Sequence, residues 1–243
     1  MKGSERPRWL LIGNSRWHWA RPDPAVPSGL RVEHHPPPPE PPAPAELEHL
    51  LAWAAVGPVP AGLLPAERRL SLAAVPLAGL PPWLGIDRAL AGWRACCLAA
   101  GPVLVADAGT VLSLTWVDGA GRFRGGRLMA GAALQWRAMG AGTAGLPRGL
   151  EAHSGQDISP EPWPQATDEA MRSGVLRGLA AAIGAAHHDA EREGGRCRLV
   201  LTGGDAGALL PLVGSAAGEG PVGEHHPDLV MEALAALRPL PGH

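Results

Sequence analysis

The feature that most constrains this chain is a strand–turn–strand unit that begins at Val103. A short apolar segment predicts a buried strand, and it ends at an Asp-Ala-Gly-Thr turn at 107–110. Alternating apolar residues at 111–116 predict a second strand, and Asp-Gly-Ala-Gly at 118–121 predicts a turn before a third strand at Phe123. A glycine in such a bend lets backbone N–H groups approach a ligand, and a carboxylate can hold a cation. The turn therefore has the groups of a phosphate-and-metal site, although a plain hairpin with a polar turn is the other interpretation of these four residues alone.

The chain contains a second unit of the same kind near its N-terminus. The apolar residues 9–12 are followed by Gly13, Asn14 and Ser15, and a segment of alternating character follows at 16–19. Two such units in one chain are the layout of the actin/hexokinase/Hsp70-type ATPase fold. In that fold two related α/β domains face a nucleotide, and each contributes a phosphate-binding hairpin.

The chain resembles the type III pantothenate kinases, which catalyse the first step of coenzyme A synthesis. The resemblance implies two ribonuclease H-like domains, each a mixed sheet with helices, expected at 1–104 and 105–243. It covers most of the chain in the family's order, and it rests on Gly13-Asn14-Ser15, Gly85-Ile86-Asp87-Arg88, Asp107-Ala108-Gly109-Thr110, Gly125-Gly126 with Gly131, residues 167–174, and Leu201-Thr202-Gly203-Gly204-Asp205.

The resemblance implies a pantothenate site around Asp87. Asp87 would be the base that takes the proton from the pantothenate hydroxyl, and Arg88 would bind the carboxylate side of the same substrate with its planar fork of donors. Gly85, Ile86 and Thr167 would complete this site. From the residues alone, Asp87 is an ordinary N-cap or first-turn acid near the start of the helix expected at 89–99, and Thr167 is an N-cap of the longest helix.

The resemblance also implies a site for ATP with its Mg²⁺ and for a monovalent cation. Asp107 would hold K⁺ or NH₄⁺. The residues implied in ATP binding are Ile12, Gly13, Asn14, Ser15, Arg16 and Thr110.

One position departs from the family. Its first phosphate motif begins with an aspartate, and this chain has Leu11 there. In many kinases of the fold that aspartate helps to hold the magnesium of Mg-ATP, although Mg²⁺ keeps several waters and relies on substrate phosphates. Arg16 and His18 are the nearby side chains that could compensate. A non-catalytic nucleotide-binding or regulatory relic is therefore the alternative function, and a sugar kinase of the same fold is a third.

Composition limits the remaining classes. The formal net charge is −2 and no basic run stands out, which argues against nucleic acid as a partner. No apolar run reaches the roughly 18 residues of a membrane span, so we expect no membrane insertion and a cytoplasmic enzyme. The three cysteines have no metal-binding spacing. The resemblance further implies a homodimer, with the apolar helices at 89–99 and 170–190 as candidate surfaces.

The remaining elements follow from periodicity. Residues 9–33 predict a meander of strands, and the proline-rich stretch 36–44 predicts a surface loop, with an SH3-type ligand as the other interpretation. Residues 72–75 predict a strand and 198–201 another. Helices are expected at 45–55, 89–99, 132–141, 167–193 and 229–237.

Overall fold

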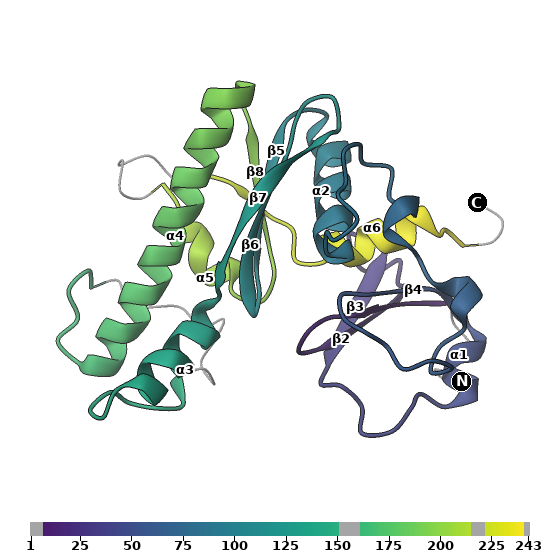
Figure 1. Ribbon diagram of the computed structural model, residues 1–243, viewed down its shortest axis with the longest axis horizontal. Coiled ribbons are helices and arrows are strands. Elements are labelled where there is room, and N and C mark those ends of the chain that lie inside the picture. Colours follow the sequence, from purple (N-terminus) through teal and green to yellow (C-terminus); the bar gives the residue numbers. More distant parts are fainter. Residues whose placement is uncertain (1–6, 151–160, 215–221, 241–243) are drawn as a thin grey trace. The chain divides into compact units, whose positions relative to one another are not determined.

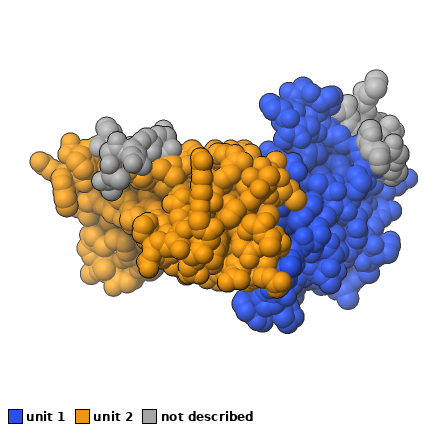
Figure 2. All heavy atoms as spheres, turned by 90° about the horizontal axis from the view of Figure 1, so that it is seen from above, with its two compact units in different colours: residues 1–94, 228–243 blue, residues 95–227 orange. Residues whose placement is uncertain are grey.

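A computed structural model describes residues 7–150, 161–214 and 222–240, which form two compact α/β units (Figure 1). Unit 1 comprises residues 1–94 and 228–243, and unit 2 comprises residues 95–227 (Figure 2). The division expected from the sequence, at 104/105, falls inside strand β5 (Val103–Ala108). The compact units divide instead at Arg94, and the C-terminal residues return to unit 1.

Unit 1 is built on a four-stranded sheet in the order β3-β2-β1-β4. Strands β1 (Arg8–Ile12), β2 (Trp17–Pro22) and β3 (Leu30–His35) form an antiparallel meander, as expected. Strand β4 (Leu50–Ala55) pairs in parallel with β1. Since side chains alternate along a strand, each face of this sheet carries every second residue.

Both faces of this sheet are covered. Helix α6 (Leu229–Leu237) packs on β1, β2 and β4, and the indole Nε1 of Trp9 donates to the carbonyl of Arg238 at 2.8 Å. The opposite face buries an apolar cluster of Leu10, Ile12, Trp17, Leu50, Trp53 and Leu64. Trp9 and Leu11 therefore lie on the α6 side, and Leu10 and Ile12 lie on the other.

Two expectations for unit 1 were wrong. The helix expected at 45–55 is a short helix α1 (Pro44–Glu48) followed by strand β4, because Leu50–Ala55 is buried between both covers of the sheet. A strand buried on both faces is continuously apolar, so it also matches helical spacing. The strand expected at 72–75 is a 3₁₀ turn, Leu72–Ala74, which follows another at Ala66–Arg68. The helix expected at 89–99 is α2 (Ile86–Ala99).

Unit 2 is built on a mixed sheet in the order β7-β6-β5-β8-β9. Antiparallel β5, β6 (Val111–Val117) and β7 (Phe123–Ala130) form the predicted hairpins, and β8 (Arg198–Thr202) lies parallel to β5 and to the short β9 (Glu224–His225). The helices are α3 (Ala132–Gly142), α4 (Thr167–Gly194) and α5 (Ala206–Leu209), with a 3₁₀ turn at Leu210–Leu212.

Helix α4 is the main cover of this sheet (Figure 1). It buries Leu176, Leu179 and Ile183 against a core that includes Leu104 of β5 and Leu114 of β6. Its N-cap is Ala166 and not the expected Thr167, because the N–H of Ala170 donates to the Ala166 carbonyl. Within the described residues, no helix combines the length and the apolar character that crossing a membrane requires.

The docking of α6 on the sheet of unit 1 can be tested with Leu234→Ala. Leu234 is fully buried, so its truncation should lower the free energy of unfolding by about 2–5 kcal/mol. Urea unfolding followed by tryptophan fluorescence measures the change. Ala236→Ser, at an exposed position on the same helix, is the control and should shift stability by no more than about 0.5 kcal/mol. Equal effects of the two changes would contradict this packing.

Candidate functional site

The first phosphate turn lies between β1 and β2 of unit 1. The N–H of Gly13 donates to the carbonyl of Arg16 at 2.9 Å, which closes the turn and leaves Asn14, Ser15 and Arg16 exposed. A Cβ at Gly13 would lie 3.0 Å from the Arg16 carbonyl oxygen, so the tight turn favours glycine. Ile12 is buried just before it. The five residues expected at this turn, Ile12 to Arg16, thus run from a buried strand end into an exposed turn.

Leu11, where the family has an aspartate, is a buried residue on the α6 side of the sheet. Its cross-strand partner on β2 is His18, and His18 in turn pairs with His34 on β3. The Nδ1 atoms of the two histidines are 2.6 Å apart, and their rings meet edge to face. Position 11 therefore contributes no polar group, and its cross-strand partner on the same face is the polar His18.

The surroundings of the two histidines lower the pKa of both rings. Burial lowers the pKa of His18 to about 4, and the positive charges of His34 and Arg16 add to this effect. Burial also lowers the pKa of His34, although the negative charge of Asp228 opposes the change. Sequence reasoning missed His34 in this role. The signal was the alternation of two adjacent strands, which places residues 18 and 34 on one face, but that signal requires the register of β2 and β3.

The expected pantothenate motif forms the first turn of α2. The Oδ1 atom of Asp87 accepts a hydrogen bond from the backbone N–H of Arg88 at 2.8 Å. A Cβ at Gly85 would lie only 2.6 Å from this oxygen, so the glycine makes room for the carboxylate. Burial raises the pKa of Asp87, and the hydrogen bond and charge of Arg88 oppose the shift. A carboxylate that is poorly solvated but still ionisable is suited to accept a proton.

The second phosphate turn, in unit 2, lies where parallel strands β5 and β8 end. Asp107 is in register with Thr202, and the chain then turns at Gly203 with a positive φ of 90°. A Cβ at Gly203 would lie 2.6 Å from Oδ1 of Asp107 and 2.7 Å from the Ala108 carbonyl oxygen. The Gly203 turn thus packs its backbone directly onto the end of β5. The group assembled at this strand end is a carboxylate with backbone carbonyls.

A second glycine of unit 2, Gly131, packs against the same hairpin. The N–H of Gly131 donates to the Thr110 carbonyl at 3.0 Å, and a Cβ at Gly131 would lie 2.8 Å from that same oxygen. Thr110 itself is exposed. Asp107 lies near the end of β5 and Thr110 in the turn that follows, with the backbone of Gly203 close to the first and that of Gly131 close to the second. Thr167 also lies in unit 2, exposed at the start of α4.

The chemistry of these residues fits oxygen-binding cations and anionic phosphates. Asp107 and the neighbouring carbonyl oxygens are hard donors of the kind that K⁺ accepts. Over the part of the chain that is described, no group of three or more His, Cys, Asp or Glu side chains could hold a metal ion.

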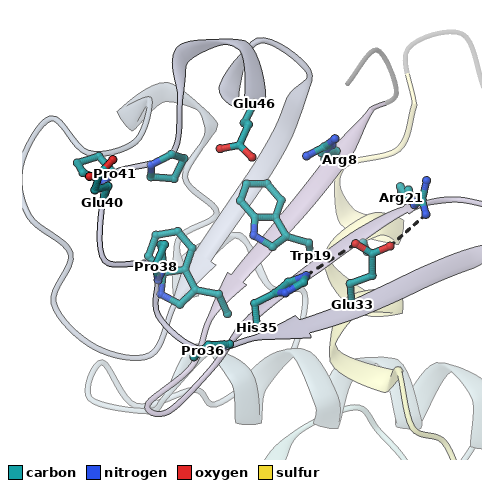
Figure 3. Close-up of a pocket in the computed structure, with 13 residues that line it drawn as sticks. Arg8, Trp19, Arg21, Glu33, His35, Pro36, Pro38, Glu40, Pro41 and Glu46 are labelled. Atoms are coloured by element: carbon teal, nitrogen blue, oxygen red, sulfur yellow. Dashed lines mark hydrogen bonds and ion pairs between the residues drawn. The ribbon is translucent and has the colours of Figure 1, made fainter. Parts of the chain in front are cut away.

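A cavity of about 480 Å³ lies elsewhere in unit 1, between the sheet and the proline-rich segment (Figure 3). Trp19, Pro38 and Pro41 line it, and so do Glu33 and Arg21, which form an ion pair at 3.0 Å. None of the site residues expected from the sequence lines this cavity. The glycine turns and Asp87, and not this hollow, carry the chemistry that the motifs predict.

Comparisons with known proteins agree with the motifs. The profile of the family described as "Type III pantothenate kinase" matches residues 78–189. A protein of that name from Synechococcus sp. (strain JA-3-3Ab) is 37% identical over 98% of this chain and 95% of its own length. A second, from Synechococcus elongatus, is 35% identical over 84% of this chain and 86% of its own.

Solved structures share the fold at low sequence identity. A "conserved putative Baf family transcriptional activator" from Campylobacter jejuni has a TM-score of 0.58 and 17% identity, covering 95% of this chain and 96% of its own. The ethanolamine utilization protein EutJ from Carboxydothermus hydrogenoformans has a TM-score of 0.51 and 11% identity, covering 96% and 89%. These likenesses bear on the fold alone, and they agree with the two-domain ATPase architecture expected from the paired turns. The identity to the Synechococcus proteins extends over nearly the whole chain, and on that ground the chain belongs to the type III pantothenate kinase family.

Proposed function

We propose that this protein phosphorylates pantothenate with ATP, the first step of coenzyme A biosynthesis, and that Asp87 is the base. The observation that carries the proposal is the first turn of α2, where the half-buried Asp87 carboxylate, with a raised pKa, packs against Gly85 beside Arg88. The relatives that match the whole chain bear the name of this activity. A cytoplasmic location belongs to the same proposal.

The proposed reaction transfers the terminal phosphoryl group of ATP to the pantothenate hydroxyl. Asp87 accepts the hydroxyl proton as the oxygen–phosphorus bond forms and the bond to ADP breaks. Arg88 binds the carboxylate of pantothenate, with Gly85, Ile86 and Thr167 completing the substrate site. Because the transition state of phosphoryl transfer needs little covalent assistance, catalysis depends mainly on positioning and on charge stabilisation.

The phosphate turns supply that stabilisation in the proposal. Residues Ile12 to Arg16 and Thr110 bind ATP in this proposal, and Mg²⁺ accompanies the nucleotide. Asp107 holds a monovalent cation, K⁺ or NH₄⁺, which adds positive charge beside the phosphates. The exposed Asn14, Ser15 and Thr110 support these assignments, since their polar side chains can reach a ligand.

A regulatory protein without catalysis is the second candidate function. The loss of the carboxylate at position 11 favours it, and the Campylobacter protein that shares the fold is described as a transcriptional activator. Against it stands the Gly85–Arg88 turn, because a protein that only binds nucleotide has no need for a base beside an arginine. A sugar kinase would use such a base, but its substrate has no carboxylate for Arg88 to bind.

Asp87→Asn separates the catalytic candidate from the regulatory one. The amide keeps the shape and the hydrogen bond from Arg88 but cannot take up the proton, so we expect kcat to fall by about 10²–10⁴-fold. The KM for pantothenate should change much less, because Arg88 remains. A coupled assay of ADP release with ATP, pantothenate and K⁺ measures both. Wild-type activity in the variant would rule out Asp87 as the base.

The same variant should be more stable than the wild type. The folded-state pKa of Asp87 lies above its ordinary value of 3.8. The neutral carboxyl therefore contributes its full stability to the fold below pH 3.8, and this contribution is lost as the pH rises through the folded-state pKa. At pH 8 Asp87→Asn should therefore melt at a higher temperature than the wild type, and the difference should shrink toward pH 4. Thermal melts across this range test the sign.

The cation assignment predicts a dependence on the salt. If Asp107 binds K⁺ or NH₄⁺, activity should fall at least about tenfold in buffers that contain only Na⁺ or Li⁺, and K⁺ at equal ionic strength should restore it. Asp107→Asn should remove the difference between the salts. Equal wild-type rates in all four salts would contradict the assignment.

We also propose a homodimer. In unit 2, Leu128 on the edge strand β7 and Val111 are exposed apolar side chains, and Leu98 of α2 is a third. A second copy of the chain would cover such residues. Sedimentation at the concentration of the assay should give twice the monomer mass, and an active monomer would contradict the proposal.

A further inference from the structure

We infer that His18, with its ring positioned by His34, donates a hydrogen bond from Nε2 to a phosphate oxygen of ATP at the Gly13 turn. This inference rests on the nucleotide-binding part of the proposed function. It assigns a direct phosphate contact to a side chain that the motifs of the family do not contain.

The position of His18 on the sheet is the first argument. His18 lies directly across from Leu11 and on the same face, so it is the polar side chain adjacent to the place where the family has a carboxylate. Its Nε2 atom would lie 3.3 Å from a Cβ at Gly13. The edge of the imidazole that carries Nε2 therefore faces the phosphate turn.

The hydrogen bond to His34 is the second argument, because it leaves the neutral pair only two arrangements of its hydrogens. Only one of the two Nδ1 atoms, 2.6 Å apart, can carry the shared hydrogen. When His18 donates the shared hydrogen, its Nε2 carries none. When His34 donates it, the neutral His18 carries its own hydrogen on Nε2. If the pair takes up one further proton, both Nε2 atoms carry hydrogens. The last two of these states present an N–H group from His18 toward Gly13.

The charges around the pair are the third argument. Arg16 on the turn and His35 on β3 disfavour a second positive charge, whereas Asp228, which precedes α6, favours one on His34. The phosphates of a bound nucleotide would add negative charge on the turn side. Binding should therefore keep the hydrogen on Nε2 of His18 and leave the excess positive charge near Asp228.

The replacement of the family's aspartate by Leu11, with His18 as the polar neighbour, changes how the turn binds a phosphate. A carboxylate at position 11 would repel phosphate and would act through a cation. A neutral imidazole next to an apolar Leu11 can contact the phosphate directly. The leucine and the histidine together thus replace a contact through a cation by a direct hydrogen bond.

Two substitutions at His18 distinguish the contributions of its two nitrogen atoms to nucleotide binding. The amide nitrogen of Gln reaches about as far as Nε2 of His, and that of Asn only as far as Nδ1. His18→Asn should therefore weaken the binding of a non-hydrolysable ATP analogue by about 10–100-fold, as for the loss of a hydrogen bond to a charged group. His18→Gln should stay within about threefold of the wild type. Titration calorimetry measures the affinities.

His34→Leu tests the positioning of the ring. It removes the Nδ1 partner, so we expect intermediate weakening, with KM for ATP raised and KM for pantothenate unchanged. His35→Gln is the matched control, since this exposed histidine lies on the opposite face of the same sheet and should have no effect. Thermal melts of each variant establish that the protein remains folded.

The outcomes distinguish the inference from the proposed function. If His18→Asn and His34→Leu bind the analogue as His35→Gln does, the inference is wrong, and pantothenate phosphorylation is unaffected by that result. If the wild type binds ATP through His18 but releases no ADP with pantothenate, the inference holds and the proposed function fails. A folded wild type that binds no ATP would overturn both.

Discussion

The close approach of one backbone to another at the ends of strands is the constraint on which the functional parts of this protein depend. At Gly203 a side chain would occupy the space of the Asp107 carboxylate, and at Gly131 it would meet the carbonyl of Thr110. At Gly85 it would displace the carboxylate of Asp87. In each case a polar oxygen occupies the space that a Cβ would need. The absence of a side chain at these glycines is why the acids and carbonyls stand where a ligand can reach them.

This constraint explains why the turns could be predicted from the sequence and their surroundings could not. Gly13 and Gly109 each follow a short apolar strand. Because a glycine turn depends only on its neighbours in the sequence, the sequence is sufficient to predict it. Asp87 and Arg88 are likewise adjacent residues at a helix start. Burial alters the proton affinity of Asp87, and the residues next to it in the sequence carry no signal of that burial.

The errors have the same origin. Residues 50–55 match helical spacing, but they form β4 because β1 offers a parallel partner and both faces are covered. The pairing of His18 with His34 follows from the register of two strands joined by the loop at 23–29. The residue pattern of one segment cannot predict either the strand at 50–55 or the contact between the two histidines, because both depend on which strands pair.

The C-terminal helix α6 has a consequence for the order in which the protein can be assembled. The strands of unit 1 are synthesised before unit 2, yet one face of their sheet is covered by residues 229–237. Unit 2, at 95–227, is contiguous and has every segment of its core available before that helix leaves the ribosome. One apolar face of the unit 1 sheet therefore stays exposed until residues 229–237 have been synthesised. The unit whose synthesis begins first is completed last.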